Sequence, residues 1–197
     1  MGDTTNKAWA EFKTPLSQDA LLLFCHDVEQ LFRINPYLEV IKWKKIQPHK
    51  HYIDVLNHSQ NPGFSLQTTL CVTDIANGIK LHYAKGIKSD TTIVASATVE
   101  GSKLVITENY NTHQIDSDAN LLATVDKSLK QWAEEIQAYL INWNRWSWFL
   151  PWRYYKQRIW LPMKPSARRI AYMLIWISFI EIALIGLGVI VYLLDYR

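Results

Sequence analysis

A carboxylate flanked by two tyrosines is the strongest candidate for chemistry in this sequence. Two alternating runs, at residues 79–83 and 104–110, place every second side chain on one face of a β-sheet. Glu108 would share that face with Tyr83 and Tyr110, where it could act as a general acid or base. A glutamate near a strand end is also commonly solvated or hydrogen-bonded to a tyrosine, and both interpretations stay open. The residues expected to face a ligand from these strands are Leu81, Tyr83, Leu104, Ile106, Glu108 and Tyr110.

Other catalytic and metal-binding patterns are absent from the sequence. It contains no nucleophile elbow, phosphate-binding loop, dinucleotide fingerprint or paired-histidine zinc motif. The six histidines neither pair at helical i, i+4 spacing nor combine with a cysteine at metal-ligand spacing. Cys25 and Cys71 lie in apolar patterns that are typical of buried free thiols. We therefore predict no catalytic residue, no metal and no cofactor.

Charge is distributed unevenly along the 197 residues. Residues 1–141 carry 13 Lys/Arg and 16 Asp/Glu, whereas residues 142–197 carry 8 and 2. The mildly acidic body lacks the basic face that nucleic-acid binding needs, so no nucleic-acid partner is expected. A basic tail beside an apolar run is instead typical of a segment at an anionic membrane surface. The length suits one domain with an appended segment.

The apolar run at residues 170–194 predicts a single transmembrane helix. It has 25 residues and one charge, and at about 1.5 Å per residue it can cross a hydrocarbon core of about 30 Å. Because Lys164, Arg168 and Arg169 precede it, the positive-inside rule predicts a cytoplasmic N-terminal domain and a C-terminus on the opposite side. The first 13 residues contain no apolar signal region that would export the domain.

Glu181 lies near the centre of this run, where an ionised carboxylate costs at least about 2.5 kcal/mol. It either faces lipid in its neutral form or contacts a partner helix, from another protein or from a second copy. Ala183 and Gly186 add small side chains that allow a neighbouring helix to approach closely. These three residues are the predicted contacts with a membrane partner.

The segment at residues 144–169 combines tryptophan, tyrosine and cationic side chains with three prolines. This composition favours a broken helix in the lipid headgroup layer, with rings buried and cations extended outward. An ordinary linker is the alternative. The expected interface residues are Trp146, Trp148, Trp152, Arg153, Tyr154, Tyr155, Lys156, Arg158, Trp160, Arg168 and Arg169.

The elements that would position these groups follow from the hydrophobic periodicity. Residues 7–15 predict a strand, and residues 17–34 predict an amphipathic helix that ends at an Asn-Pro break. Between residues 40 and 110 the period changes to two, and turn residues separate six strands. Such short connections require an antiparallel meander. A long helix follows, and its apolar stripe is expected to line a cavity against the sheet with Leu122, Val125, Leu129, Trp132 and Ile136.

This order of elements resembles the helix-grip fold of the START-like superfamily, which includes polyketide cyclases and Bet v 1-type allergens. The sequences FKTPL at residues 12–16 and RINPY at residues 33–37, with the strand order, carry the resemblance. It implies an α+β fold, with a curved antiparallel sheet around a long C-terminal helix, and a cavity for a lipid, sterol, quinone or similar molecule. The expected organisation is a START-like domain at 1–143, an interface segment at 144–169, a transmembrane helix at 170–194 and a short tail at 195–197.

The main functional hypothesis is a membrane-anchored domain that binds or transfers a hydrophobic small molecule at the membrane surface. Its expected partners are membrane lipid, that ligand, and an integral membrane protein or a second copy of the chain. An accessory or assembly subunit, docked on a membrane complex through the transmembrane helix, is the alternative. A cyclase or hydrolase acting on an apolar substrate is a third hypothesis, and the absence of a catalytic motif favours binding without catalysis.

Overall fold

The computed structural model describes residues 7–59, 63–110 and 119–196, and the side chains of all of these except 119–127. The chain forms two compact units, Met1–Pro162 and Met163–Arg197.

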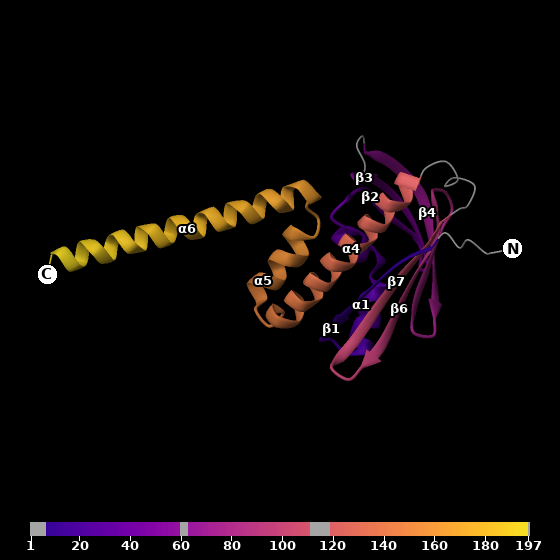
Figure 1. Ribbon diagram of the computed structural model, residues 1–197, viewed down its shortest axis with the longest axis horizontal. Coiled ribbons are helices and arrows are strands. Elements are labelled where there is room, and N and C mark those ends of the chain that lie inside the picture. Colours follow the sequence, from indigo (N-terminus) through magenta and orange to yellow (C-terminus); the bar gives the residue numbers. More distant parts are fainter. Residues whose placement is uncertain (1–6, 60–62, 111–118, 197) are drawn as a thin grey trace. The chain divides into compact units, whose positions relative to one another are not determined.

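The first unit contains a seven-stranded antiparallel sheet with the order β1-β7-β6-β5-β4-β3-β2 (Figure 1). The first strand pairs with the last, and β2 to β7 follow one another as a meander, which confirms the predicted strand order. The bounds are β1 Lys7–Thr14, β2 Leu38–Gln47, β3 Lys50–Asn57, β4 Phe64–Ile75, β5 Gly78–Tyr83, β6 Lys88–Thr98 and β7 Gly101–Tyr110.

The hairpin predicted at Asn77-Gly78 joins β4 to β5, with Ala76 and Asn77 as its turn and Gly78 as the first residue of β5, opposite Ile75. Gly78 lies opposite Val94 in the neighbouring strand. A Cβ atom at Gly78 would lie 1.9 Å from the backbone oxygen of Ile93. Glycine is therefore required here by the close approach of β6, in addition to its preference for hairpin turns.

Two short helices, α1 (Gln18–His26) and α2 (Val28–Ile34), replace the single helix expected from the sequence. The break lies at Asp27, whose backbone N–H donates to the carbonyl of Phe24 (3.1 Å). The Asp27 carboxylate in turn accepts a hydrogen bond from the Gln30 N–H (3.0 Å) and caps α2. The hydrophobic periodicity continues through this point, which is why it did not reveal the break.

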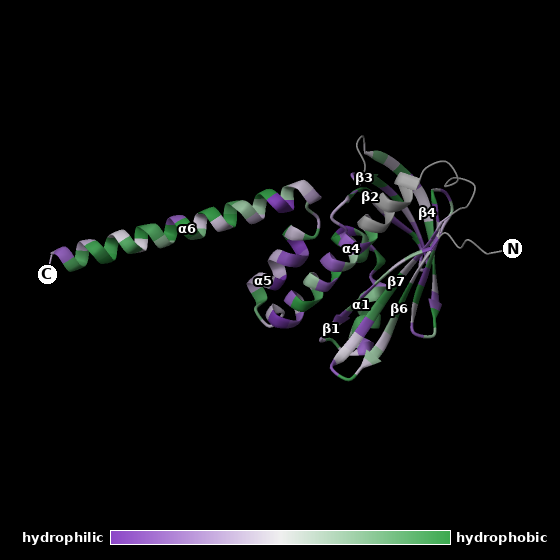
Figure 2. Cartoon of the chain, viewed as in Figure 1, coloured by the Kyte–Doolittle hydropathy of each residue, from purple (hydrophilic) through white to green (hydrophobic). Residues whose placement is uncertain are grey.

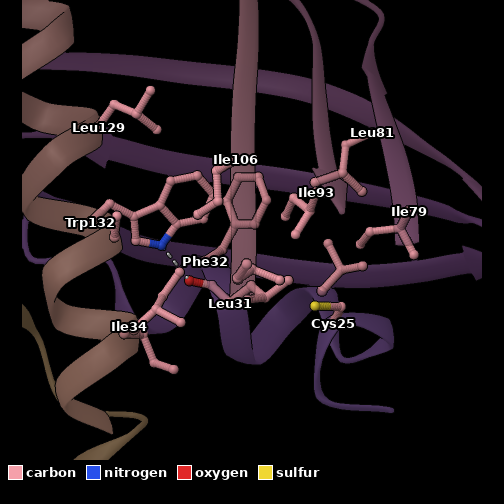
Figure 3. Packing of buried hydrophobic residues seen from close by; sticks show 14 of the residues in the cluster. Cys25, Leu31, Phe32, Ile34, Ile79, Leu81, Ile93, Ile106, Leu129 and Trp132 are labelled. Atoms are coloured by element: carbon pink, nitrogen blue, oxygen red, sulfur yellow. Dashed lines mark hydrogen bonds between the residues drawn. The ribbon is translucent and has the colours of Figure 1, made fainter. Parts of the chain in front are cut away.

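The long helix α4 (Ala119–Trp146) packs against β1 and α2. Its described apolar stripe is buried, as predicted, with Leu129, Trp132 and Ile136 at most 2% exposed. Figure 3 shows this stripe facing the side chains of the sheet and of α1 and α2. The Trp132 Nε1–H donates to the backbone oxygen of Leu31 (3.0 Å), which ties α4 to α2 inside the core.

The first unit continues beyond the predicted domain end at residue 143. Helix α5 (Leu150–Tyr154) and a π-helical turn, η1 (Tyr155–Trp160), both belong to it. Trp143 and Trp160 pack against the hydrophobic core as partly buried side chains. Aromatic packing therefore extends the first unit to Pro162. Composition alone did not predict this packing.

The second unit consists of helix α6 (Pro165–Asp195), which is coloured as hydrophobic along most of its length in Figure 2. It begins at Pro165, five residues before the predicted span. Proline suits the first position of a helix, because the backbone N–H that proline lacks would have no partner within the helix there. Its most apolar window has a mean hydropathy of 2.5 and is 0% buried. Within the part of the chain that the structure describes, α6 is the one helix long and apolar enough to cross a membrane.

Candidate functional site

A cavity of about 240 Å³ lies between the sheet, the end of α2 and the long helix α4. Most of its lining residues are apolar or aromatic, and six are polar or charged. This composition is typical of sites for small hydrophobic ligands. The lining residues are Phe32, Asn35, Tyr37, Leu38, Val55, Asn57, Ser59, Phe64, Leu66, Tyr83, Lys85, Gly86, Ile87, Lys88, Tyr110 and Ser128.

The apolar wall of the cavity is formed by neighbouring strands. Val55 of β3 lies opposite Leu66 of β4 in the antiparallel register. Along β4, Phe64 and Leu66 are half-buried while Ser65 between them is exposed, so alternation turns the apolar side chains inward. Gly86, with φ of +124°, closes this wall in the connection from β5 to β6. A Cβ atom there would lie 3.2 Å from Leu66 Cδ1.

An ion pair lies beside the cavity, at the end where β6 begins and β7 ends. Lys88, which is opposite Tyr110 in the strand register, donates from its ammonium group to Glu108. The Tyr110 hydroxyl donates to the other oxygen of the same carboxylate. Glu108 is fully buried, so both of its oxygens are bonded inside the protein. A buried carboxylate requires such partners, because an unpaired charge in this environment is costly.

Tyr83 adds a second polar group to the cavity wall. Its hydroxyl lies 3.1 Å from Thr91 Oγ1, and both residues are buried. Burial, with a smaller contribution from the nearby Glu108 carboxylate, raises the pKa of Tyr83 well above its ordinary value. The phenol therefore stays protonated and remains available as a hydrogen-bond donor.

These contacts show the surroundings of Glu108, and an acid or base role for it stays a prediction. In the structure, the Glu108 carboxylate is hydrogen-bonded to a tyrosine, which is Tyr110. Lys88 is an additional partner of the same carboxylate. Glu108 is not solvated, and it lies beneath the cavity wall. Lys88 and the two tyrosines do reach the cavity, and the Lys88 ammonium group, which has three N–H donors, can still donate to a bound molecule.

The predicted cavity residues occupy two different places. Tyr83 and Tyr110 line the cavity. Six others lie in the packed core, where helix and sheet side chains contact one another; these are Leu81, Leu104, Ile106, Leu129, Trp132 and Ile136. The side chains of Leu122 and Val125 lie outside the described residues. Contact of any of these residues with a ligand stays a prediction.

Several lining residues were missed because their positions depend on the tertiary structure. Lys88 begins β6, and only the register with β7 brings its side chain to Glu108. Phe64 and Leu66 belong to an alternating run that sequence analysis had identified as a strand but had not assigned to the cavity. The signal that could have revealed the ion pair is a lysine at the start of one strand of a hairpin with a glutamate near the end of the other strand.

The predicted membrane-interface residues also fall into two groups. Trp152 packs on Trp143, with ring centroids 5.8 Å apart, and Trp160 lies 6.0 Å from Tyr139. Lys156 Nζ is 3.9 Å from the centre of the Trp160 ring, a cation–π distance. Tyr155 and Arg168 are half-buried as well. The exposed members are Trp146, Trp148, Arg153, Tyr154, Arg158 and Arg169.

Metal-binding groups do not gather in the described part of the chain. There, no three His, Cys, Asp or Glu side chains lie close enough to hold a metal ion. Both cysteines are free; Cys25 is buried, while Cys71 is only half-buried because alternation places it on the face of β4 opposite to the buried Leu70.

Comparison with solved structures places this architecture among known folds. The chain is similar to a protein from Thermus thermophilus, with 14% identity, a TM-score of 0.55, and coverage of 68% of this chain and 96% of that one. It is also similar to a START superfamily protein from Mycobacterium smegmatis, with 11% identity, a TM-score of 0.52, and coverage of 68% of this chain and 96% of that one. A third similar structure, a protein from Deinococcus radiodurans, has 9% identity, a TM-score of 0.50, and coverage of 69% of this chain and 95% of that one.

Sequence comparison adds no closer relative, since no family model and no curated protein matches this chain. The structural similarity is therefore a similarity of fold. It agrees with the seven-stranded antiparallel sheet and the long helix α4 described above. The first unit of this chain has the helix-grip fold of the START-like superfamily, as its sequence predicted.

Proposed function

We propose that this protein binds a hydrophobic small molecule in the cavity of its helix-grip domain, and that α6 anchors the domain to a membrane. The cavity carries the proposal, because most of its lining residues are apolar or aromatic. The fold supports a binding role by analogy only, since related folds can serve unrelated functions.

The cavity also limits the chemistry of the ligand. Its volume of about 240 Å³ is below the roughly 300–1,000 Å³ of pockets for drug-sized molecules. We therefore expect a small molecule, or one end of a longer chain. Lys88 favours a hydrogen-bond acceptor on the ligand, such as a hydroxyl or carbonyl oxygen, beside the ion pair, because its ammonium group has three N–H donors.

Membrane anchoring is supported by the properties of α6. The helix has 31 residues, and at about 1.5 Å per residue it exceeds the thickness of a hydrocarbon core. The helix is apolar on nearly all sides, which suits a surrounding of lipid. The basic residues that precede it favour a domain on the cytoplasmic side.

The binding proposal is tested by blocking the cavity. The full chain is purified in lipid nanodiscs, and small molecules retained by the protein are measured by native mass spectrometry and by analysis of organic extracts. Leu66→Trp fills the apolar wall, whereas Ser65→Trp places the same ring on the opposite face of β4. We expect the first variant to lose the retained molecule and the second to keep it. Equal retention by both, or no retained molecule in the wild type, contradicts the proposal.

A second candidate function, an accessory subunit of a membrane complex, is favoured by one observation. Glu181 is an acidic side chain on the apolar helix α6, near its middle. In a membrane such a group is stabilised by a hydrogen bond from a partner, worth about 0.6–2 kcal/mol. Glu181→Leu should therefore lose co-purifying membrane proteins, while Glu181→Gln should retain more of them. Identical partners in all three proteins would remove this candidate.

A further inference from the structure

The turn between α4 and α5 exposes a group of large apolar side chains on the first unit. Trp148 is 75% exposed and Leu150 is 71% exposed, with Phe149 between them also exposed. We call residues 147–150 the α4–α5 corner. Exposed apolar groups of this size, clustered in four residues, indicate a surface that is covered by something other than water.

The corner is fixed rather than free at its base. The Phe149 N–H donates to the carbonyl of Trp146 (3.0 Å), and the Arg153 N–H donates to the carbonyl of Phe149 (3.1 Å). Below it, Trp152 packs on Trp143, and Trp143 stacks on Tyr139 with ring planes only 12° apart. The aromatic residues of this region therefore divide into an inner stack that supports the corner and an outer group that projects from it.

Charge identifies the chemistry of the surface that the corner would meet. Between Glu135 and Glu181 the sequence carries seven Lys or Arg residues and no Asp or Glu. Arg145 and Arg153 flank the corner directly, and both are exposed. Tryptophan, phenylalanine and leucine with flanking arginines suit the boundary between anionic headgroups and acyl chains.

Chain continuity favours a membrane over a soluble acidic protein as the occupant. The last residue of the first unit is Pro162, and α6 begins at Pro165, so Met163 and Lys164 are the whole connection. If α6 spans a bilayer, the four residues between Trp160 and Pro165 hold the end of η1 within about 18 Å of the start of α6.

We infer that the α4–α5 corner enters the headgroup layer of an anionic membrane, with Trp148, Phe149 and Leu150 inserted and Arg145 and Arg153 contacting lipid phosphates. This inference rests on the proposed anchoring by α6 and adds a second, peripheral contact. It also divides the interface predicted from the sequence, because the half-buried Trp152 and Trp160 pack on Trp143 and Tyr139 inside the first unit.

The test measures the depth of a spin label beside the inserted residues. Cys71→Ser leaves the buried Cys25, and Ser147→Cys then places a nitroxide in the corner without removing its apolar side chains. The full chain is reconstituted in nanodiscs of phosphatidylglycerol and phosphatidylcholine. Accessibility to oxygen and to a water-soluble nickel chelate gives the depth. Labels at Ser65→Cys and Ile185→Cys report the exposed sheet face and the middle of α6.

We expect the label at 147 to be shielded from the chelate in discs with anionic lipid, and the label at 65 to be accessible. Trp148→Ser combined with Leu150→Ser should shift the label at 147 towards water. Trp9→Ser, which removes an equally exposed tryptophan from β1, should not. Discs of phosphatidylcholine alone should give a shallower label at 147, because the arginines then lose their anionic partners.

The outcomes separate this inference from the proposed anchor. A label at 147 that is fully accessible to the chelate, while the label at 185 is deep, overturns the corner contact and leaves the anchor intact. An accessible label at 185 rejects the anchor, and the label at 147 then still decides whether the corner binds lipid by itself. Equal depth at 147 in neutral and anionic discs overturns the role of the two arginines.

Discussion

The Lys88 ammonium group donates to the carboxylate of Glu108, the one charged side chain that is fully buried in the part of the chain that the structure describes. Removing the cation alone would leave a buried negative charge that retains only the Tyr110 hydroxyl as a partner. Since Lys88 is one-third exposed, we expect Lys88→Met to destabilise the fold by about 3 kcal/mol, the lower end for such pairs. Denaturation of the full chain in mild detergent, followed by near-ultraviolet circular dichroism, measures this loss.

The exposed ion pair between Lys103 and Glu11 provides the control for that experiment. Lys103→Met should cost less than about 1 kcal/mol, because water screens the charges. The double variant Lys88→Met with Glu108→Gln should recover part of the stability that Lys88→Met loses. If the single and double variants unfold alike, the buried charge is not the cause.

Alkaline pH should weaken the first unit through buried protonated groups. Burial raises the pKa of the Cys25 thiol from 9.0 to about 12. Between these values the unfolded chain loses a proton that the folded chain keeps. Stability is therefore present in full below about pH 9 and decreases as the pH rises towards 12, by at most about 1.4 kcal/mol per pH unit.

Tyr139 acts in the same direction, since burial raises its pKa from 10.0 to about 12. Urea unfolding of the full chain at pH 8, 9, 10 and 11 measures the combined slope. Cys25→Ala should flatten the slope above pH 9, whatever its effect on stability at pH 8. An unchanged slope in this variant would show that Cys25 does not titrate as its burial requires.

Gly78→Ala should disrupt the pairing of β5 with β6. The added methyl group would lie 1.9 Å from the backbone oxygen of Ile93, which cannot move without breaking the strand register. We expect a loss of about 3 kcal/mol, the upper end for overpacked sites. Thermal unfolding of the full chain measures it. Gly186→Ala is the matched control, because nothing lies within 4 Å of that position, and the unfolding of the first unit should not change.

Membrane orientation gives a further prediction. A reporter fused after Arg197 should lie on the side of the membrane opposite to the domain, because Lys164, Arg168 and Arg169 precede the apolar part of α6. Reversal of these three charges to glutamate should reduce the fraction of correctly oriented protein. Protease protection of the reporter in sealed vesicles measures both. A reporter on the same side as the domain would contradict a single span.

Local sequence patterns predicted the parts of the fold that depend on local structure. Alternation in β7 placed Leu104, Ile106, Glu108 and Tyr110 on one face, and all four are buried. The Asn-Gly turn and the stripe of α4 were predicted for the same reason, since each depends on neighbours within a few residues.

The cavity depends on contacts between distant segments, and the sequence predicted it less well. Leu81 and Ile106 face inward as expected, but they pack against helices and not against empty space. The cavity lies further along, where Leu66, Tyr83 and Lys88 are brought together by strand register. Periodicity identifies which face is buried, whereas the position of a cavity along that face depends on where the helices stop filling it.

The length of α4 sets how far a bound molecule is held from the corner. Ser128 lines the cavity and Trp146 ends the helix, so eighteen residues separate them, or about 27 Å along the axis at 1.5 Å per residue. With α4 upright on a membrane, the cavity stands above the headgroups by nearly the thickness of a bilayer core. A ligand would then be exchanged with a carrier or enzyme in the aqueous phase, and direct exchange with the leaflet would require α4 to lie parallel to the membrane plane.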